Sequence, residues 1–110
     1  MDERKIDGLV ISKTVTVDYV GQTENGVPNG WGKAYFNNGS MYDGEWKDGK
    51  MHGKAKELYT DGTLQYEGYY KDGYRDGRGK SFNTNGTVNY DGEWKQGKKV
   101  DAPNTATNWA

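Results

Sequence analysis

A short motif of aromatic residues and glycines recurs along this chain at nearly constant spacing, and it constrains the fold more than any other feature. The best-preserved copy, residues 42–62, reads YDGEWKDGKMHGKAKELYTDG, and a second full copy occupies residues 66–86. A more divergent copy, residues 19–39, precedes them, and a half copy, residues 90–98, follows. The tyrosines that open the copies, at positions 19, 42, 66 and 90, are 23, 24 and 24 residues apart. A fixed period of this length predicts a repeat array whose units bury each other's apolar faces.

Within each copy, the alternation of residue types predicts a β-hairpin. Tyr42, Gly44 and Trp46 share one face of the first strand, while Asp43 and Glu45 share the other. Glycine lowers strand propensity, so we expect the central glycine of each copy to lie against an aromatic ring of the adjacent hairpin. These glycines are Gly44, Gly68 and Gly92.

Turn chemistry divides each copy into two strands. Residues 47–53 are predicted as the hairpin loop, with an Asp-Gly turn at 48–49, and residues 53–59 as the second strand. The one 23-residue step suggests a deletion after Gly39, where we expect a bulge or a tighter turn. Counting back two residues from each repeat tyrosine places Val17, Leu64 and Val88 on the face of those tyrosines.

Composition is compatible with a folded chain despite a shortage of aliphatic residues. The 110 residues carry a net charge of only −1 and include nine Tyr and four Trp, whose rings replace an aliphatic core. There is no cysteine, so neither disulfides nor thiolate metal ligands are expected. The start of the chain has no secretory signal and no segment is apolar enough for a transmembrane helix, so we expect a cytoplasmic protein.

The two ends depart from the repeat. Residues 9–19 alternate as a strand, apart from Lys13, and we interpret residues 1–18 as an N-terminal capping strand over the open end of the array. The repeats then span residues 19–41, 42–65, 66–89 and 90–97. Residues 98–110 lose the pattern and are interpreted as a C-terminal tail, either disordered or held by Val100 and Trp109.

The motif Tyr-x-Gly-x-Trp, followed by glycines 7, 11, 13 and 20 residues after the tyrosine, resembles the MORN (membrane occupation and recognition nexus) repeat over residues 19–98. Thr23 in place of an aromatic residue, Ala55 in place of a glycine, and two 24-residue units depart from the family pattern. The resemblance implies an all-β fold: a single, gently curved antiparallel sheet of stacked β-hairpins with no helix of note. It also implies a protein-interaction or dimerisation module, with phospholipid binding claimed for some members.

The aromatic residues are therefore the predicted protein-binding residues. The repeat aromatics form the core first, and those on the uncovered face of a single-layer sheet are also expected to line a binding groove. Three further aromatics break the pattern and are either contacts with the chain ends or binding hot spots. The full set is Tyr42, Trp46, Tyr66, Tyr70, Tyr90, Trp94, Trp31, Tyr69 and Tyr74.

We expect a non-enzymatic module that binds another protein, as a small adaptor or as an inhibitor of the immunity or antitoxin type. The alternative is a peripheral membrane module that binds anionic phospholipid through Lys47, Lys71 and Lys95, and a homodimer is a third reading. Recurring carboxylates and recurring lysines are expected to form like-charge ladders about 10 Å apart on a solvated face. No cofactor, metal or nucleic-acid partner is expected, because His52 is the single histidine and there is no basic patch.

Overall fold

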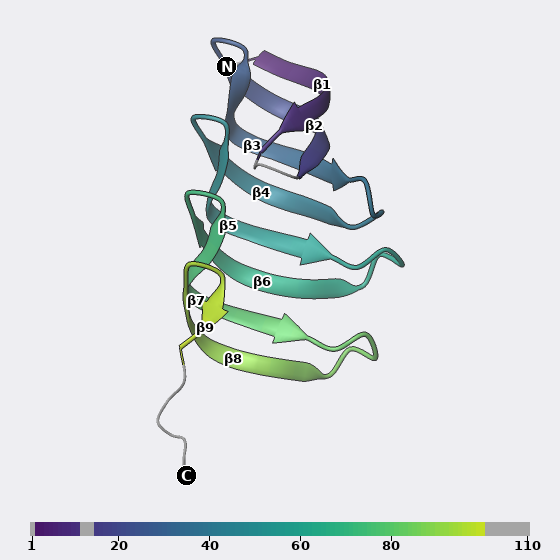
Figure 1. The fold of residues 1–110 in the computed structure, drawn as a ribbon, viewed down its shortest axis with the longest axis vertical. Helices are drawn as coiled ribbons and strands as arrows, with labels where there is room; N and C mark the ends of the chain where they lie inside the picture. Colours follow the sequence, from purple (N-terminus) through teal and green to yellow (C-terminus); the bar gives the residue numbers. More distant parts are fainter. Residues whose placement is uncertain (1, 12–14, 101–110) are drawn as a thin grey trace.

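The computed structural model describes residues 2–11 and 15–100 as a single open sheet of antiparallel strands stacked in chain order (Figure 1). Each strand pairs with the next one along the chain, as expected for successive hairpins. The all-β fold class is therefore confirmed. The nine strands are β1 (Asp2–Val10), β2 (Thr16–Glu24), β3 (Val27–Phe36), β4 (Met41–Lys47), β5 (Lys50–Leu58), β6 (Leu64–Lys71), β7 (Tyr74–Phe82), β8 (Val88–Lys95) and β9 (Lys98–Lys99).

The hairpin loops are shorter than the sequence suggested. Lys47 pairs directly with Lys50, so only Asp48 and Gly49 lie in the loop and β5 begins at Lys50. Both loop residues have positive φ, 51° and 83°, which is the backbone required for a two-residue hairpin turn. The prediction of a loop over residues 47–53 is wrong, because this turn joins the two strands without further residues.

The change between 23- and 24-residue spacing has a different origin from the one expected. The backbone bonds of the turn between hairpins are the same in all three copies, and Met41, Leu64 and Val88 follow the turn at equivalent positions. The extra residue of the longer units comes next, as a bulge at Gln65 and at Asn89. No deletion follows Gly39. Because each bulge shifts the alternation, Leu64 and Val88 pair with Leu58 and Phe82 on the face opposite the repeat tyrosines, which corrects their predicted placement.

The chain ends also differ in detail from the prediction. The strand predicted over residues 9–19 is divided between β1, which ends at Val10, and β2, which begins at Thr16. Lys98 and Lys99, assigned to the C-terminal tail from sequence, form β9, and the Val100 N–H donates to the carbonyl of Glu93. Lys13 and Trp109 lie outside the described residues.

Aromatic rings form the core as one continuous series across the sheet. Six edge-to-face contacts, with centroid separations of 5.0 to 5.4 Å, join seven rings. In order, the rings belong to Tyr19, Trp46, Tyr42, Tyr70, Tyr66, Trp94 and Tyr90. We call the side of the sheet that carries them the ring face and the opposite side the outer face. Edge-to-face pairs stabilise beyond the area that they bury, so the series compensates for the missing aliphatic core.

The rings fit because small residues lie beneath them. A side-chain carbon on Gly79 would come within 2.1 Å of the Tyr66 hydroxyl oxygen, so only glycine fits there. A carbon on Gly68 would lie 2.5 Å from Cα of Gly79. The nearest ring atom to Gly68 belongs to Tyr66 of its own strand, so the expectation of a ring from the adjacent hairpin is wrong.

Burial of the tyrosine hydroxyls predicts loss of stability at high pH. Burial raises the pKa of both Tyr19 and Tyr66 from 10.0 to about 12, and it raises the pKa of Tyr42 and Tyr70 as well. The unfolded chain releases these protons at lower pH than the folded chain does. The stabilisation is therefore complete below pH 10 and is lost as the pH rises through about 12. Urea unfolding at increasing pH should show this decline, whereas a flat profile would mean that the hydroxyls are open to solvent.

Candidate functional site

The hairpin tips bend back over one face of the sheet and stack on one another in a column (Figure 1). This is the ring face, because Arg75 near one tip lies over the ring of Tyr66. The column is held by main-chain hydrogen bonds from the glycine of each tip to the second strand of the hairpin before it. The Gly49 N–H donates to Pro28, the Gly73 N–H to Met51 and the Gly97 N–H to Arg75, at 2.8–2.9 Å. The tips thus form one wall of a channel along the ring face.

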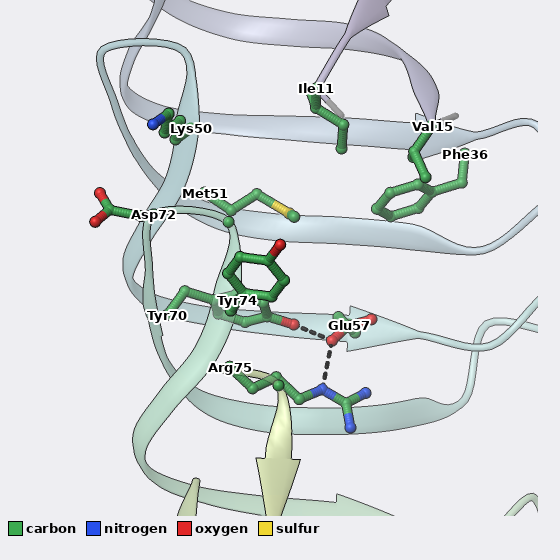
Figure 2. A pocket seen from close by; sticks show the side chains of 12 residues that line it. Ile11, Val15, Phe36, Lys50, Met51, Glu57, Tyr70, Asp72, Tyr74 and Arg75 are labelled. Atoms are coloured by element: carbon green, nitrogen blue, oxygen red, sulfur yellow. Dashed lines mark hydrogen bonds and ion pairs between the residues drawn. The ribbon is translucent and has the colours of Figure 1, made fainter. Parts of the chain in front are cut away.

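A cleft of about 470 Å³ lies between this wall and the N-terminal hairpin (Figure 2). Its apolar lining consists of Ile11, Val15 and Phe36 on one side and Met51 and Tyr74 on the other. The polar residues that line it include Glu57, Tyr70 and Arg75. A largely apolar cleft with a few convergent polar groups is typical of a binding site.

Three polar side chains of the cleft, Glu57, Tyr70 and Arg75, form one hydrogen-bonded cluster, shown by the dashed lines in Figure 2. Arg75 Nε donates to Glu57 Oε1 at 2.9 Å, and the Tyr70 hydroxyl donates to the same oxygen. The Glu57 and Arg75 side chains are 20% and 19% exposed. The Arg75 guanidinium also lies over the ring of Tyr66, 4.4 Å from its centroid. This cluster is an ion pair that is mostly withdrawn from water and packed on the aromatic core.

The ionisation properties of the cluster follow from its burial and its charges. Burial raises the pKa of the Tyr70 hydroxyl, and the Glu57 charge raises it further. Burial by itself would lower the pKa of Arg75, but the charge and hydrogen bond of Glu57 outweigh it, so the pKa is raised. The Arg75 guanidinium therefore stays charged and the Tyr70 hydroxyl stays neutral.

This cluster occurs once among the described repeats, between Glu57 of one repeat and Tyr70 and Arg75 of the next, and it was not predicted from the sequence. The position of Glu57 is occupied by Ala34 and Ser81 in the neighbouring copies, and the position of Arg75 by Met51 in the preceding copy. A comparison of the copies at these two positions would have marked both residues as exceptions. Their proximity depends on the bent hairpin tip, which the periodicity does not reveal.

The predicted binding residues fall into two groups. Most repeat aromatics are core residues, with Tyr42, Tyr66, Tyr70, Trp46 and Trp94 exposed by 5% or less, and Tyr90 is half-buried. The three pattern-breaking aromatics are exposed: Trp31 by 54%, Tyr69 by 48% and Tyr74 by 57%. Tyr74 lines the cleft, whereas Trp31 and Tyr69 lie on the outer face, so the structure does not bring the three together.

The recurring carboxylates and the recurring lysines alternate from strand to strand. On the outer face, cross-strand pairing interleaves the recurring carboxylates with the recurring lysines, as in the neighbours Asp43, Lys56 and Glu67. Lys47, Lys71 and Lys95 are exposed at the hairpin tips, the first two next to Asp48 and Asp72. Like charges therefore recur on every second strand, about 10 Å apart as predicted, and the strand between them supplies the opposite sign.

Residues 2–11 and 15–100 contain no cluster of His, Cys, Asp and Glu that could hold a metal ion, and no helix able to span a membrane. His52 is half-buried at the start of β5, and its Nδ1 finds no hydrogen-bond partner among these residues.

Comparison with known families identifies MORN repeats at four stretches, residues 19–41, 42–64, 66–88 and 90–100. The boundaries of these matches leave out residues 65 and 89, the two bulge positions. The bulges are thus additions to the regular unit. No curated protein matches the sequence.

Proposed function

The chain belongs to the MORN repeat family, whose repeats are binding modules for proteins and membranes, and from this premise we propose that it is a non-enzymatic module that binds a segment of another protein. The observation that carries the proposal is the cleft on the ring face, with its apolar walls and its single ion pair. Within this class we propose an adaptor or an inhibitor, which acts by bridging or covering what it binds.

The cleft suits an extended polypeptide that places an apolar side chain against Met51 and Tyr74. Tyr74 contributes a large, exposed ring on the rigid column of hairpin tips, as expected of a hot-spot residue. The hydrogen bond from Arg75 to Glu57 uses Nε and not the two terminal nitrogens of the guanidinium. They are suited to donate to an oxygen of the bound segment.

The core rings Tyr70 and Trp94 are unsuitable for testing this proposal, since they are buried and their loss would disturb the fold. Tyr74→Ala removes an exposed ring from the cleft instead. We expect it to weaken binding by about 2 kcal/mol, roughly thirtyfold, without loss of structure. Titration calorimetry with a partner identified by affinity capture and mass spectrometry measures this change.

The matched control replaces the three tip lysines Lys47, Lys71 and Lys95 with glutamine. Binding through the cleft should be nearly unaffected by it, whereas a lipid-binding module would lose affinity for phosphatidylserine vesicles with each lysine removed. If the lysine variant loses binding while Tyr74→Ala retains it, the protein-binding proposal is wrong and the membrane alternative replaces it.

A further inference from the structure

The outer face carries a row of apolar side chains that the core does not use. Cross-strand pairs join Tyr35 to Met41, Met41 to Leu58, Leu58 to Leu64 and Phe82 to Val88, so the row runs from β3 to β8. Tyr35 is 44% exposed and Val88 50%, and the others are half-buried. None of the six belongs to the core cluster or packs against it. Apolar surface of this extent commonly marks an interaction site.

A row of charges runs beside the apolar row and alternates in sign without interruption. Each member pairs across strands with the next, and the salt bridges Lys56–Glu67 and Lys80–Asp91 both measure 3.9 Å. In strand order from β3 to β8, the row consists of Lys33, Asp43, Lys56, Glu67, Lys80 and Asp91. Its formal charge sums to zero, which disfavours attraction to an anionic membrane.

This charge row is complementary to its own reversed copy. An alternating row with an even number of members presents the opposite sign at every position when its order is reversed. Lys33 then faces Asp91 of a second copy, Asp43 faces Lys80, and Lys56 faces Glu67. A two-fold axis that runs parallel to the strands, between β5 and β6, reverses the strand order of the second copy. Each row of one copy then lies opposite the same row of the other copy.

The rows on either side obey the same symmetry. In the apolar row, the same axis places Leu58 opposite Leu64 of the second copy. In the next row of the outer face, it places Glu45 opposite Arg78 and the exposed ring of Tyr69 opposite Lys54, a cation–π geometry. Sheets packed face to face keep their strand directions within about 30°, as an axis along the strands requires.

We propose that the outer face is the interface of a homodimer in which two sheets pack back to back about this axis. A second copy fits this face better than an unrelated partner does, because the charge row, the apolar row and four of the six residues of the third row are complementary under one operation. The dimer leaves both clefts open on opposite sides. It would therefore present two binding sites, and a partner with two copies of the bound segment would gain avidity.

Sedimentation equilibrium over increasing concentration tests the dimer. The wild-type mass should rise from that of one chain toward that of two. Leu58→Asp, next to the axis, should weaken association at least tenfold, because it places an unpaired carboxylate in an apolar contact. Gln65→Glu, a charge change on the ring face, should associate like the wild type. A wild type that stays at the mass of one chain, or undiminished association of folded Leu58→Asp, would overturn the proposal.

Two variants whose charge row carries a single sign distinguish charge contacts between two chains from charge contacts within one chain. One triple variant replaces the three carboxylates of the charge row with lysine: Asp43→Lys, Glu67→Lys, Asp91→Lys. The other replaces its three lysines with glutamate: Lys33→Glu, Lys56→Glu, Lys80→Glu. Each variant should remain monomeric alone, and the two should associate when they are mixed. Failure of the folded variants to associate on mixing would exclude the proposed register. Flotation with phosphatidylserine vesicles is the last test. If the wild type binds the vesicles and Leu58→Asp abolishes this binding, the outer face binds a membrane and the dimer is refuted.

Discussion

Replacement of Gly68 by valine is expected to lower the free energy of unfolding by about 3 kcal/mol or more. The added side chain would begin 2.5 Å from Cα of Gly79 and 2.6 Å from the carbonyl oxygen of Arg78. Both obstacles are main-chain atoms of the neighbouring strand, which cannot move without breaking the pairing between β6 and β7. Overpacking at this point also displaces Tyr66, the ring that links Tyr70 to Trp94 in the core series.

Gly92 provides a matched control, because it occupies the equivalent position at the end of the array. The three atoms nearest to a side-chain carbon there all belong to the Tyr90 side chain, with the hydroxyl oxygen at 2.7 Å, and none is a main-chain atom. Tyr90 is half-buried and can adjust, so Gly92→Val should cost about 1 kcal/mol or less. Urea denaturation of both variants gives the comparison. Equal losses would show that main-chain crowding is not what makes Gly68 necessary.

The fold was predicted from the repeat period, the alternation of residue types and the resemblance to MORN repeats. Alternation in residues 42–46 correctly separated the ring face from the charged face, because one buried face fixes the register of a strand. The bulges were not predicted, since counting back from Tyr66 and Tyr90 assumes unbroken alternation. The main-chain hydrogen bonds of the turn between hairpins are the same in three copies. Counting forward from them locates the extra residues at Gln65 and Asn89, and places Leu64 and Val88 on the outer face.

The candidate site could be predicted only in part. Tyr74 was identified because it interrupts the pattern, and it lines the cleft. Glu57 and Arg75 were overlooked, because charged residues in a polar chain are expected to be solvated. Their contact requires the hairpin tip to bend over the ring face, and that bend depends on stacking between successive tips rather than on local sequence.

The coupling between Glu57 and Arg75 is the second large effect expected. Glu57→Ala removes the carboxylate partner of the Arg75 guanidinium, which remains largely withdrawn from water. Arg75→Met removes the cationic partner of the Glu57 carboxylate. Each change should cost about 2 kcal/mol, because an unpaired buried charge is strongly destabilising.

The double variant Glu57→Ala, Arg75→Met introduces residue types that other copies already carry at these positions. Ala34 is the equivalent of Glu57, and Met51 is the equivalent of Arg75. Replacement of a whole buried ion pair by apolar residues is often neutral, so the double variant should be no less stable than either single variant. The corresponding coupling energy, from urea unfolding of all four proteins, is about 2 kcal/mol. Additive losses would instead mean that solvent already screens each charge. In that case the ion pair would be a surface contact, and the cleft would have no fixed polar group with which to orient a bound segment.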